Sequence, residues 1–516
     1  MRRKLISMLI IGVILCARPV WAASGMFPKM PAATRVYVAD CQKDSEDARM
    51  TAWALQGLVN QTSAEVYVIS APNHLEQLQS CGKPFEMLKP LDGADAGLRT
   101  LFQKYLGNVK KMFVYDTNED WTVYLALMDG AQHQGIAVSE PVKEALISEF
   151  GWAGQVEDLR NRWTDRIDAY DWALTNLMSD CDKRVIFSPK SDRAVIEYAV
   201  ATKGFLFWLN FKKPEELAEV KKIFRTPGYT VGTSLMGYAS DGDAANDISN
   251  PFGIGYLVSA HYANGSFWSS FPDKTYTQAP GHALQAQPGK IYISILWSDG
   301  DNIAFDQNQI FNLWHDPARG TVPVTTLLNP LLQELNPPLL DWYYSKLSAD
   351  DELIAGSIGI QFISMKGFKD DLFPEWCKLN GQWCKDAGFH TAHTWMSSVS
   401  DAKSTTYASA CGYYGIIGGE TWIRPGYPPI IKCSRIVQPD QFYKQITGMQ
   451  PDARAPMFVS FLLTAESFER KTKGGGYSFI KQQVDRIEVA YPGRYVFLLP
   501  KDEFATMRAY YHAPAE

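Results

Sequence analysis

Two aspartates separated by one glycine close a strongly apolar segment, and they are the residues best suited to chemistry. Asp299 and Asp301 follow residues 291–298, whose sequence Ile-Tyr-Ile-Ser-Ile-Leu-Trp-Ser is typical of a buried strand. Side chains two residues apart share one face of an extended strand, so the two carboxylates are predicted to converge. Converging negative charges raise one pKa, or call for a cation or a network of sugar hydroxyls. The alternative is a turn in which Asp and Gly only end the strand.

If this strand end hydrolyses glycosidic bonds, a carboxylate from another strand end is expected to act with the aspartates. One carboxyl group must protonate the leaving oxygen, and another must act as nucleophile or activate water. Glu420 is the preferred partner, because it follows a predicted strand at 415–418 in the sequence Gly-Gly-Glu-Thr-Trp. The alternative for Glu420 is an exposed glutamate that caps a loop, and Glu466 is held in reserve. The predicted catalytic residues are therefore Asp299, Asp301 and Glu420.

Polar and aromatic residues near other predicted strand ends are candidates for substrate binding. Flat indole rings can stack on the apolar faces of sugars. The predicted substrate-binding set is Asn302, Trp297, Gln361, His393, Trp395, Trp422 and Glu466. For His393, the alternative is a histidine packed inside the domain.

The sequence predicts neither a metal site nor a cofactor. His390 and His393 lie three apart in a predicted strand at 389–395, so they point to opposite faces and cannot share one metal ion. Asp241, Asp243 and Asp247 lack the downstream glutamate of a calcium loop and are interpreted as a solvated acidic loop. No Walker loop, dinucleotide fingerprint or nucleophile elbow occurs in a suitable context.

The elements that must position these residues form an α/β protein. An N-terminal α/β domain is predicted at 24–150, from the alternation of short β-branched runs and helical patterns, and a second α/β section with a linker at 151–285. The stretch 266–290 is rich in Pro, Gly, Gln and Ser and is taken as the main domain boundary. The C-terminal domain, 286–516, has seven predicted strands, at 291–298, 322–327, 357–363, 389–395, 415–418, 457–463 and 495–499.

Seven β-then-helix units favour a seven-stranded (β/α) barrel-like domain, because each crossover must return over the sheet with the same hand. The chemistry of such barrels lies at the carboxyl ends of the strands. Asp299, Asp301 and Glu420 all follow predicted strands at that edge. This interpretation therefore favours a catalytic role for the two aspartates over a turn that only ends the strand.

The first residues predict export. Residues 1–23 combine Arg2, Arg3 and Lys4 with an apolar run and the small residues Ala22 and Ala23, which is the order of a cleavable signal peptide. No later window is apolar enough to span a membrane. The net charge of −6 would become about −10 after cleavage, and no basic stripe is present, which disfavours nucleic acid, so no nucleic-acid partner is expected. The protein is expected to be periplasmic or secreted.

An oxidising compartment permits disulfides. Seven cysteines remain after the predicted cleavage. Cys377 could pair locally with Cys384, and Cys411 with Cys433, although spacing alone does not fix the connectivity.

Several short blocks carry a resemblance to a known family. The segment Ser-Asp-Gly-Asp-Asn at 298–302, the Leu-Gln-Gly-Leu-Val-Asn block at 55–60, Gly-Thr-Val-Pro-Val at 320–324, Asn-Pro at 329–330 and Asp-Trp-Tyr-Tyr at 341–344 together resemble the GxGYxYP family of putative glycoside hydrolases. The namesake motif would fall near 356–364, where its Gly, Tyr and Pro positions are largely missing, so the chain resembles a divergent member. The resemblance implies a hydrolase fold and a carbohydrate substrate.

These observations predict an exported glycoside hydrolase that acts on a poly- or oligosaccharide by carboxylate acid/base chemistry. One alternative is a non-catalytic glycan-binding or envelope protein, suggested by the missing namesake motif. The other is a metal-dependent polysaccharide deacetylase, in which an aspartate pair combines with histidines.

Overall fold

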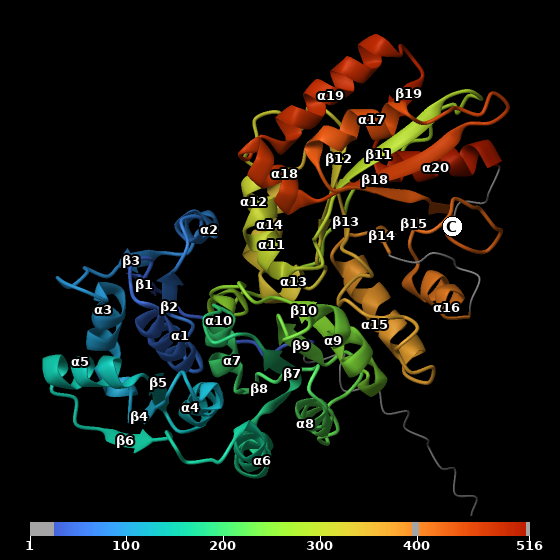
Figure 1. Ribbon diagram of the computed structural model, residues 1–516. Helices are drawn as coiled ribbons and strands as arrows, with labels where there is room; N and C mark the ends of the chain where they lie inside the picture. The colour runs from blue at the N-terminus through green and yellow to red at the C-terminus, as the bar shows by residue number, and fades with distance from the viewer. Residues whose placement is uncertain (1–24, 395–401, 512–516) are drawn as a thin grey trace, which may run out of the picture.

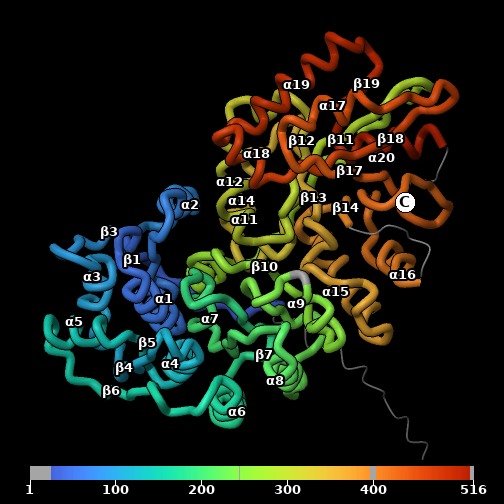
Figure 2. Tube along the Cα trace, viewed as in Figure 1, coloured from blue at the N-terminus to red at the C-terminus, as the bar shows by residue number. Residues whose placement is uncertain are grey.

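The protein is a mixed α/β structure built on four separate parallel sheets (Figure 1). The computed structural model describes residues 25–394 and 402–511. The colours of Figure 2 show that the N-terminal, middle and C-terminal parts of the chain occupy separate regions of the molecule. Within the described ranges, no helix has the length and apolar character needed to cross a membrane.

The first two sheets have three strands each, in the orders β2-β1-β3 and β5-β4-β6. Their strands are β1 (Val36–Asp40), β2 (Val66–Ile69), β3 (Phe85–Met87), β4 (Lys111–Val114), β5 (Gly135–Val138) and β6 (Gln155–Asp158). The helices among them are α1 (Glu46–Asn60), α2 (His74–Ser80), α3 (Ala96–Tyr105), α4 (Asp120–Gln132) and α5 (Glu140–Phe150). The β/α alternation predicted for this part of the chain is confirmed.

The third sheet has the order β10-β9-β7-β8 and is parallel throughout. Its strands are β7 (Asp182–Ser188), β8 (Gly204–Leu206), β9 (Ser234–Gly237) and β10 (Gly255–Val258). The neighbouring helices are α6 (Arg166–Asn176), α7 (Ile196–Thr202), α8 (Pro214–Phe224), α9 (Gly242–Ser249) and α10 (Gly265–Trp268).

The Leu-Gln-Gly-Leu-Val-Asn block at 55–60 lies in helix α1 and packs this helix against its neighbours. Gln56 donates from Nε2 to the Asn264 Oδ1 at 2.7 Å, and Asn60 donates from Nδ2 to the Ser266 Oγ at 2.8 Å. Between them, a Cβ on Gly57 would collide with the backbone of Glu197 in α7. The block therefore joins α1 to the third sheet's helices, and its polar groups satisfy buried hydrogen bonds.

The fourth sheet has nine strands, in the order β16-β15-β14-β13-β12-β11-β18-β17, with β19 also paired with β11. Its strands are β11 (Ile291–Trp297), β12 (Val324–Leu328), β13 (Asp351–Ala355), β14 (Thr391–His393), β15 (Gly415–Ile417), β16 (Ile430–Ile431), β17 (Cys433–Ile436), β18 (Met457–Leu463) and β19 (Tyr495–Phe497). The accompanying helices are α11 (Ile303–Gln307), α12 (Gln309–Leu313), α13 (Leu332–Leu335), α14 (Pro337–Ser345), α15 (Phe373–Asp386), α16 (Ala402–Cys411), α17 (Phe442–Thr447), α18 (Ala465–Thr472), α19 (Gly476–Ala490) and α20 (Pro500–Tyr511).

Strand β11 pairs along one edge with β18 and along the other with β12 and β19, and its two faces are buried in two apolar clusters. Its odd-numbered residues, Ile291 to Trp297, belong to the main hydrophobic core. Tyr292 and Leu296 point to the other face, where they join a second cluster with Ile417 and Leu462. A continuous apolar run is what a parallel strand covered on both faces requires.

The predicted strand at 357–363 is wrong. This segment is irregular, since Ile358 and Gly359 have φ values of 72° and 116°, which no strand accommodates. The strand of this region is β13, whose acidic start at Asp351 and Glu352 obscures it in the sequence. Strands β16 and β17 were not predicted either. The sheet therefore has nine strands where seven were predicted.

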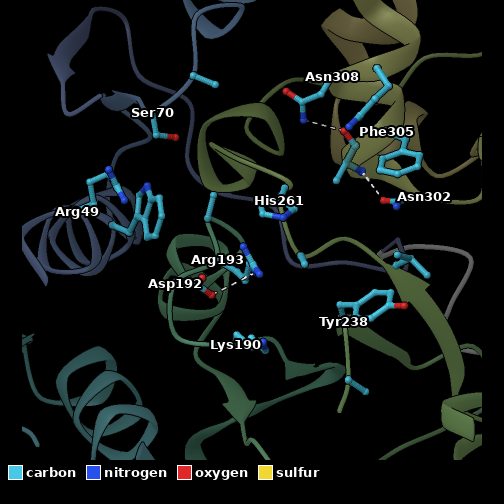
Figure 3. A pocket seen from close by; sticks show the side chains of 18 of the residues that line it. Arg49, Ser70, Lys190, Asp192, Arg193, Tyr238, His261, Asn302, Phe305 and Asn308 are labelled. Carbon is cyan, nitrogen blue, oxygen red and sulfur yellow. Dashed lines mark hydrogen bonds and ion pairs between the residues drawn. The ribbon is translucent and has the colours of Figure 1, made fainter. Parts of the chain in front are cut away.

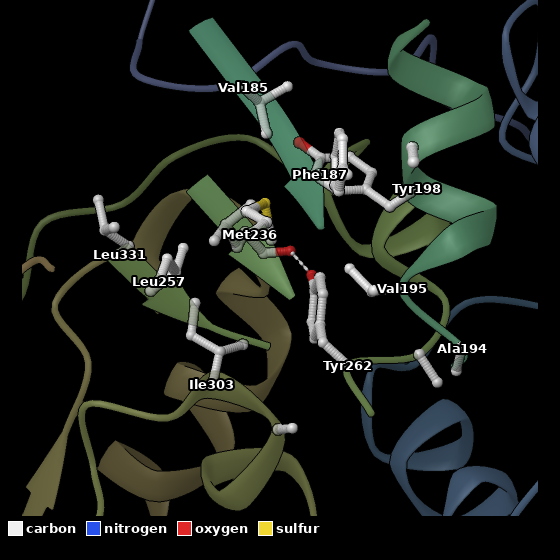
Figure 4. Packing of buried hydrophobic residues seen from close by; sticks show 14 of the residues in the cluster. Val185, Phe187, Ala194, Val195, Tyr198, Met236, Leu257, Tyr262, Ile303 and Leu331 are labelled. Carbon is white, nitrogen blue, oxygen red and sulfur yellow. Dashed lines mark hydrogen bonds between the residues drawn. The ribbon is translucent and has the colours of Figure 1, made fainter. Parts of the chain in front are cut away.

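The main core continues from the third sheet into the C-terminal part of the chain. Figure 4 shows Phe187, Met236 and Leu257 of the third sheet together with Ile303 of α11 and Leu331, which precedes α13. These residues are all buried. The segment 270–290, which holds most of the predicted boundary, contains no helix or strand.

The first described residues are anchored to this C-terminal part. The carboxylate of Glu334 accepts hydrogen bonds from the backbone amides of Met26 (3.0 Å) and Phe27 (2.9 Å), and both side chains are buried. Burial raises the pKa of Glu334 to about 7, while these two amides and Lys29 oppose the rise. More than 300 residues separate the two ends of this contact.

Candidate functional site

The backbone at the end of β11 is strained and closely packed. Asp299 has a φ of 72°, in the left-handed region that residues with a Cβ rarely adopt. A Cβ on Gly300 would collide with the carbonyl of Leu327 at the end of β12, and one on Gly356 would collide with the backbone of Gly300. The ends of β11, β12 and β13 therefore press together here, and only glycine allows the approach.

The two aspartates of this turn have raised pKa values. Burial raises the pKa of Asp301 to about 7, and the negative charge of Asp299 adds to the rise. Burial also raises the pKa of Asp299, but the hydroxyl of Ser298 opposes this by donating to Oδ2 at 2.8 Å. One carboxyl group is thus about half protonated at neutral pH, beside a carboxylate held by a hydrogen bond.

Arg435 and His393 face the same region. Arg435 pairs in register with Leu462, and His393 with Ile417, both of which belong to the second apolar cluster, so their side chains lie on that face. The positive charge of Arg435 lowers the pKa values of Asp299, Asp301 and His393. Burial is the larger cause of the lowered pKa of His393, which is about 3, so the imidazole is neutral.

Of the two carboxylates proposed as partners, Glu466 is the one that acts on the aspartates. It lies in the first turn of α18, and its charge raises the pKa of Asp299. The backbone amide of Ala465, the residue before it, donates to Ser298 Oγ at 3.3 Å. Glu420 is exposed, in the loop after β15. We call Asp299, Asp301, His393, Arg435 and Glu466 the strand-end site.

Two predicted substrate-binding residues are structural. Trp297 is fully buried and packs edge-on against Phe468 of α18 and Tyr477 of α19, so it cannot form a sugar platform. Gln361 is also fully buried, and its Nε2 donates to Gly232 O at 2.9 Å and to Ser234 Oγ at 2.6 Å. Gln361 therefore joins the C-terminal part of the chain to the third sheet. Neither Trp297 nor Gln361 is exposed to a substrate, so the two substrate-binding predictions are corrected.

The other predicted binding residues have varied surroundings. Asn302 caps α11 by accepting from the backbone amide of Ala304 at 3.0 Å. His393 is 1% exposed, and its Nδ1 is hydrogen-bonded to Ser357 Oγ at 3.0 Å. It is thus a histidine packed inside the domain, which was the alternative to substrate binding. Trp422 is half-buried, with the Arg424 guanidinium 5.1 Å from its ring centre. Trp395 lies outside the described residues.

Metal and disulfide chemistry find no support in the described ranges. No group of three or more His, Cys, Asp or Glu residues there could hold a metal ion. Asp241 caps α9 by accepting from the amide of Ala244. The seven described cysteines are all free, so the suggested Cys377–Cys384 and Cys411–Cys433 pairs are not formed. Cys411 lies instead against the backbone of Cys377, with Sγ 3.5 Å from its carbonyl oxygen.

A cavity of about 1020 Å³ lies where the first, third and fourth sheets meet (Figure 3). We call it the central cavity. It is lined at the ends of strands by Ser70, Tyr238 and His261, and from the C-terminal part by Asn302 and residues of α11 and α12. Charged and aromatic side chains complete the lining, among them Glu46, Arg49, Trp53, Lys190, Asp192, Arg193 and Trp208.

Sequence reasoning missed Arg435 and the charged residues of the central cavity. The alternation of Cys433, Arg435 and the flanking isoleucines could have identified β17 and its inward-facing arginine. The cavity residues come from three sheets, and no spacing in the sequence brings them together.

Comparisons with known proteins agree with this architecture. A crystal structure of a putative hydrolase from Bacteroides thetaiotaomicron VPI-5482 is similar over 95% of this chain and 98% of its own, with 17% identity and a TM-score of 0.79. A crystal structure of a putative polysaccharide deacetylase from Mycobacterium smegmatis aligns over 47% of this chain and 98% of its own, with 11% identity and a TM-score of 0.33. No curated protein matches the chain.

Three family models match successive parts of the chain. They are the "GxGYxYP_N second domain" at 109–181, the "GxGYxYP third domain" at 182–270 and the "GxGYxYP putative glycoside hydrolase C-terminal domain" at 289–418. Together they cover more than half of the 516 residues. The chain therefore belongs to the GxGYxYP family.

Proposed function

We propose that the protein is an exported glycoside hydrolase that cleaves a poly- or oligosaccharide at the strand-end site. The observation that carries the proposal is the pair of carboxyl groups after β11, one with its pKa raised to about 7 by burial and by its neighbour. A general acid must be protonated near the working pH, whereas its partner must be ionised. Asp301 is suited to the first role and Asp299 to the second.

The surroundings of the pair support this division of roles. Ser298 donates a hydrogen bond to Asp299, which favours its ionised form. Arg435 supplies a positive charge that acts on both groups. Glu466 adds a third carboxylate, and Glu420, the partner preferred from the sequence, stays a second candidate on the loop after β15. Either glutamate could accept a hydrogen bond from a water molecule or a sugar hydroxyl beside the aspartates.

The sheet topology supports a barrel-like arrangement around the site. Strands β16 and β17 are separated by Lys432 alone, and they pair with β15 and β18 respectively. One short segment therefore connects strands from both ends of the sheet. The second apolar cluster also collects residues from β11, β12, β13, β15, β16 and β18 beneath α20. We propose that the nine-stranded sheet curls accordingly, with the site at its carboxyl edge.

Export is proposed from residues 1–23, which lie outside the described residues. Their charged, apolar and small-residue order is that of a signal peptide. Mass spectrometry of the protein recovered from the periplasm or medium of an expressing bacterium tests this. The expected mature chain begins at residue 23 or 24, and an intact Met1 would refute cleavage.

The activity is tested by screening the purified protein on polysaccharides and following new reducing ends. Asp301→Asn is expected to lower the rate at least about a hundredfold, because general acid catalysis contributes that much or more. Asp370→Asn is the matched control, since this side chain is 93% exposed on a loop. Glu466→Gln and Glu420→Gln, compared in the same assay, identify the partner carboxylate.

Three results would contradict the proposal. A rate unaffected by Asp301→Asn would remove the carboxyl pair from the mechanism. Release of acetate that stops with a chelator would indicate the deacetylase alternative. Glycan binding that survives in every variant, with no turnover of any polysaccharide, would indicate a non-catalytic binding protein.

A further inference from the structure

The central cavity has the size and position of a ligand site. Its volume of about 1020 Å³ is that of a pocket for a small molecule or a short oligosaccharide. Its walls come from loops after β2, β7, β9 and β10 and from α11 and α12, and the carboxyl ends of parallel strands are where α/β proteins bind ligands. It is continuous in the chain with the strand-end site, because Asn302 lines it and directly follows Asp301.

The charges that line the cavity leave a positive excess. Arg193 is paired with Asp192, its Nε lying 3.2 Å from Oδ1. Arg49 donates to the backbone oxygen of Asp44 at 3.1 Å and forms no ion pair with any residue of the described ranges. Lys190 is exposed and forms no ion pair with any described residue. Glu46 offsets one of these charges. The cavity is thus cationic in a chain whose net charge is −6.

The histidine at the centre of the cavity does not add to this charge. The pKa of His261 is lowered by partial burial and by the positive charge of Arg193, which outweighs the opposite effect of Asp192. The imidazole is therefore neutral at physiological pH. It offers one hydrogen-bond donor and one acceptor, as a sugar hydroxyl requires.

Aromatic rings line the cavity beside the cations. Tyr238 is 56% exposed, although it is a large aromatic side chain at the end of β9. In the view of Figure 3, Tyr238 and Asn302 lie on one side and Arg49, Arg193 and Lys190 on the other, with His261 between them. Trp208 and Trp53 add two indoles to the lining. An exposed ring facing cations suits a ligand with an apolar face and an anionic group.

We propose that the central cavity binds an acidic saccharide, in which an anionic substituent of a sugar contacts Arg49, Arg193 and Lys190 and the ring stacks on Tyr238. The proposal names the substrate class of the proposed hydrolase and in that sense rests on it. Its test measures binding alone, so it does not depend on turnover. A carboxylate and a sulfate ester share the required charge, and the experiment distinguishes them.

The experiment is isothermal titration of the full chain with three probes of equal length: trigalacturonate, its fully methyl-esterified form, and a sulfated neutral trisaccharide. Trigalacturonate or the sulfated probe is expected to bind, and the neutral ester to bind at least about tenfold more weakly, since losing a charge-assisted contact costs that much or more. Binding of only one acidic probe identifies the anionic group.

Variants connect the binding to the cavity. Lys190→Ala and Tyr238→Ala are each expected to weaken binding at least about fivefold. The matched control Lys378→Ala, an exposed lysine on α15, is expected to leave the affinity unchanged. Both cavity side chains are exposed, and thermal unfolding of each variant checks that the fold is intact.

The outcomes separate this proposal from the proposed function. Equal affinity for the neutral ester, no binding of any probe, or affinity unaffected by Lys190→Ala would overturn the cavity assignment. Binding with no turnover of any acidic polysaccharide would instead refute the hydrolase alone.

Discussion

Replacing Asp301 by asparagine is expected to stabilise the folded protein at neutral pH while it removes activity. Burial and the charge of Asp299 raise the pKa of Asp301 from 3.8 to about 7, so ionising this carboxyl group costs free energy that the unfolded chain does not incur. At about 1.4 kcal/mol for each pKa unit, the cost is about 4 kcal/mol. Asparagine has the same shape and cannot ionise, so the variant avoids this cost.

The pH dependence follows from the sign of the shift. Because the folded state holds the proton more tightly, the contribution of Asp301 to stability is complete below about pH 4 and is lost as the pH rises toward about 7. The stability gained in Asp301→Asn should therefore be small near pH 4 and should grow to about 4 kcal/mol above pH 7. Denaturant unfolding at several pH values, compared with Asp370→Asn, measures this difference.

A gain that does not change with pH, or a loss of stability at about pH 8, would refute the reasoning. The other buried carboxyl groups, such as Glu334, make the unfolding of both proteins depend on pH. Their effects cancel in the difference between the variant and the unmodified chain, provided that they do not contact Asp301. Comparing the difference, rather than either curve, isolates Asp301 together with Asp299 and Asp306, which are coupled to it by charge.

Three further predictions concern packing. Gly57→Ala should lower the free energy of unfolding by about 3 kcal/mol, because its Cβ would collide with the Glu197 backbone. Gly107→Ala is the control, because a Cβ at this position meets nothing within 4 Å. Urea unfolding that gives both variants the same stability would contradict the prediction. Gln361→Ala should cost about 3 kcal/mol through three lost hydrogen bonds, and an unchanged thermal midpoint would contradict this. The mature protein, denatured without reductant, should titrate seven thiols with Ellman's reagent, and five or fewer would indicate a disulfide.

The sequence predicted those elements whose local pattern and tertiary surroundings agree. Strand β11 carries seven apolar or small residues and is buried on both faces, so its pattern has one interpretation. Helix α1 likewise begins after Ser45, whose side chain accepts from the amide of Ala48, and serine is a residue that favours this capping position. The aspartates after β11 were identified for the same reason, since an apolar strand seldom ends in two acids.

The errors arose where tertiary contacts override the local pattern. Residues 357–363 alternate as a strand would, but the close approach of Gly356 to Gly300 and the left-handed Ile358 turn the chain away. Strand β13 begins with acids that the fold satisfies, since Arg319 donates to Asp351 at 2.5 Å. Trp297 was expected at an open strand end, yet α18 and α19 cover it. Such coverage depends on residues more than 150 positions away.

The contact between Glu334 and the first described residues has a consequence for how the molecule can be divided. A fragment that ends near residue 285 would leave Met26 and Phe27 without the carboxylate that binds their amides. The complementary C-terminal fragment would keep Glu334 with no amide donors. During synthesis, moreover, Met26 and Phe27 cannot form this contact until Glu334 of α13 has been made. The first described residues thus reach their final place only after more than 300 further residues have been synthesised.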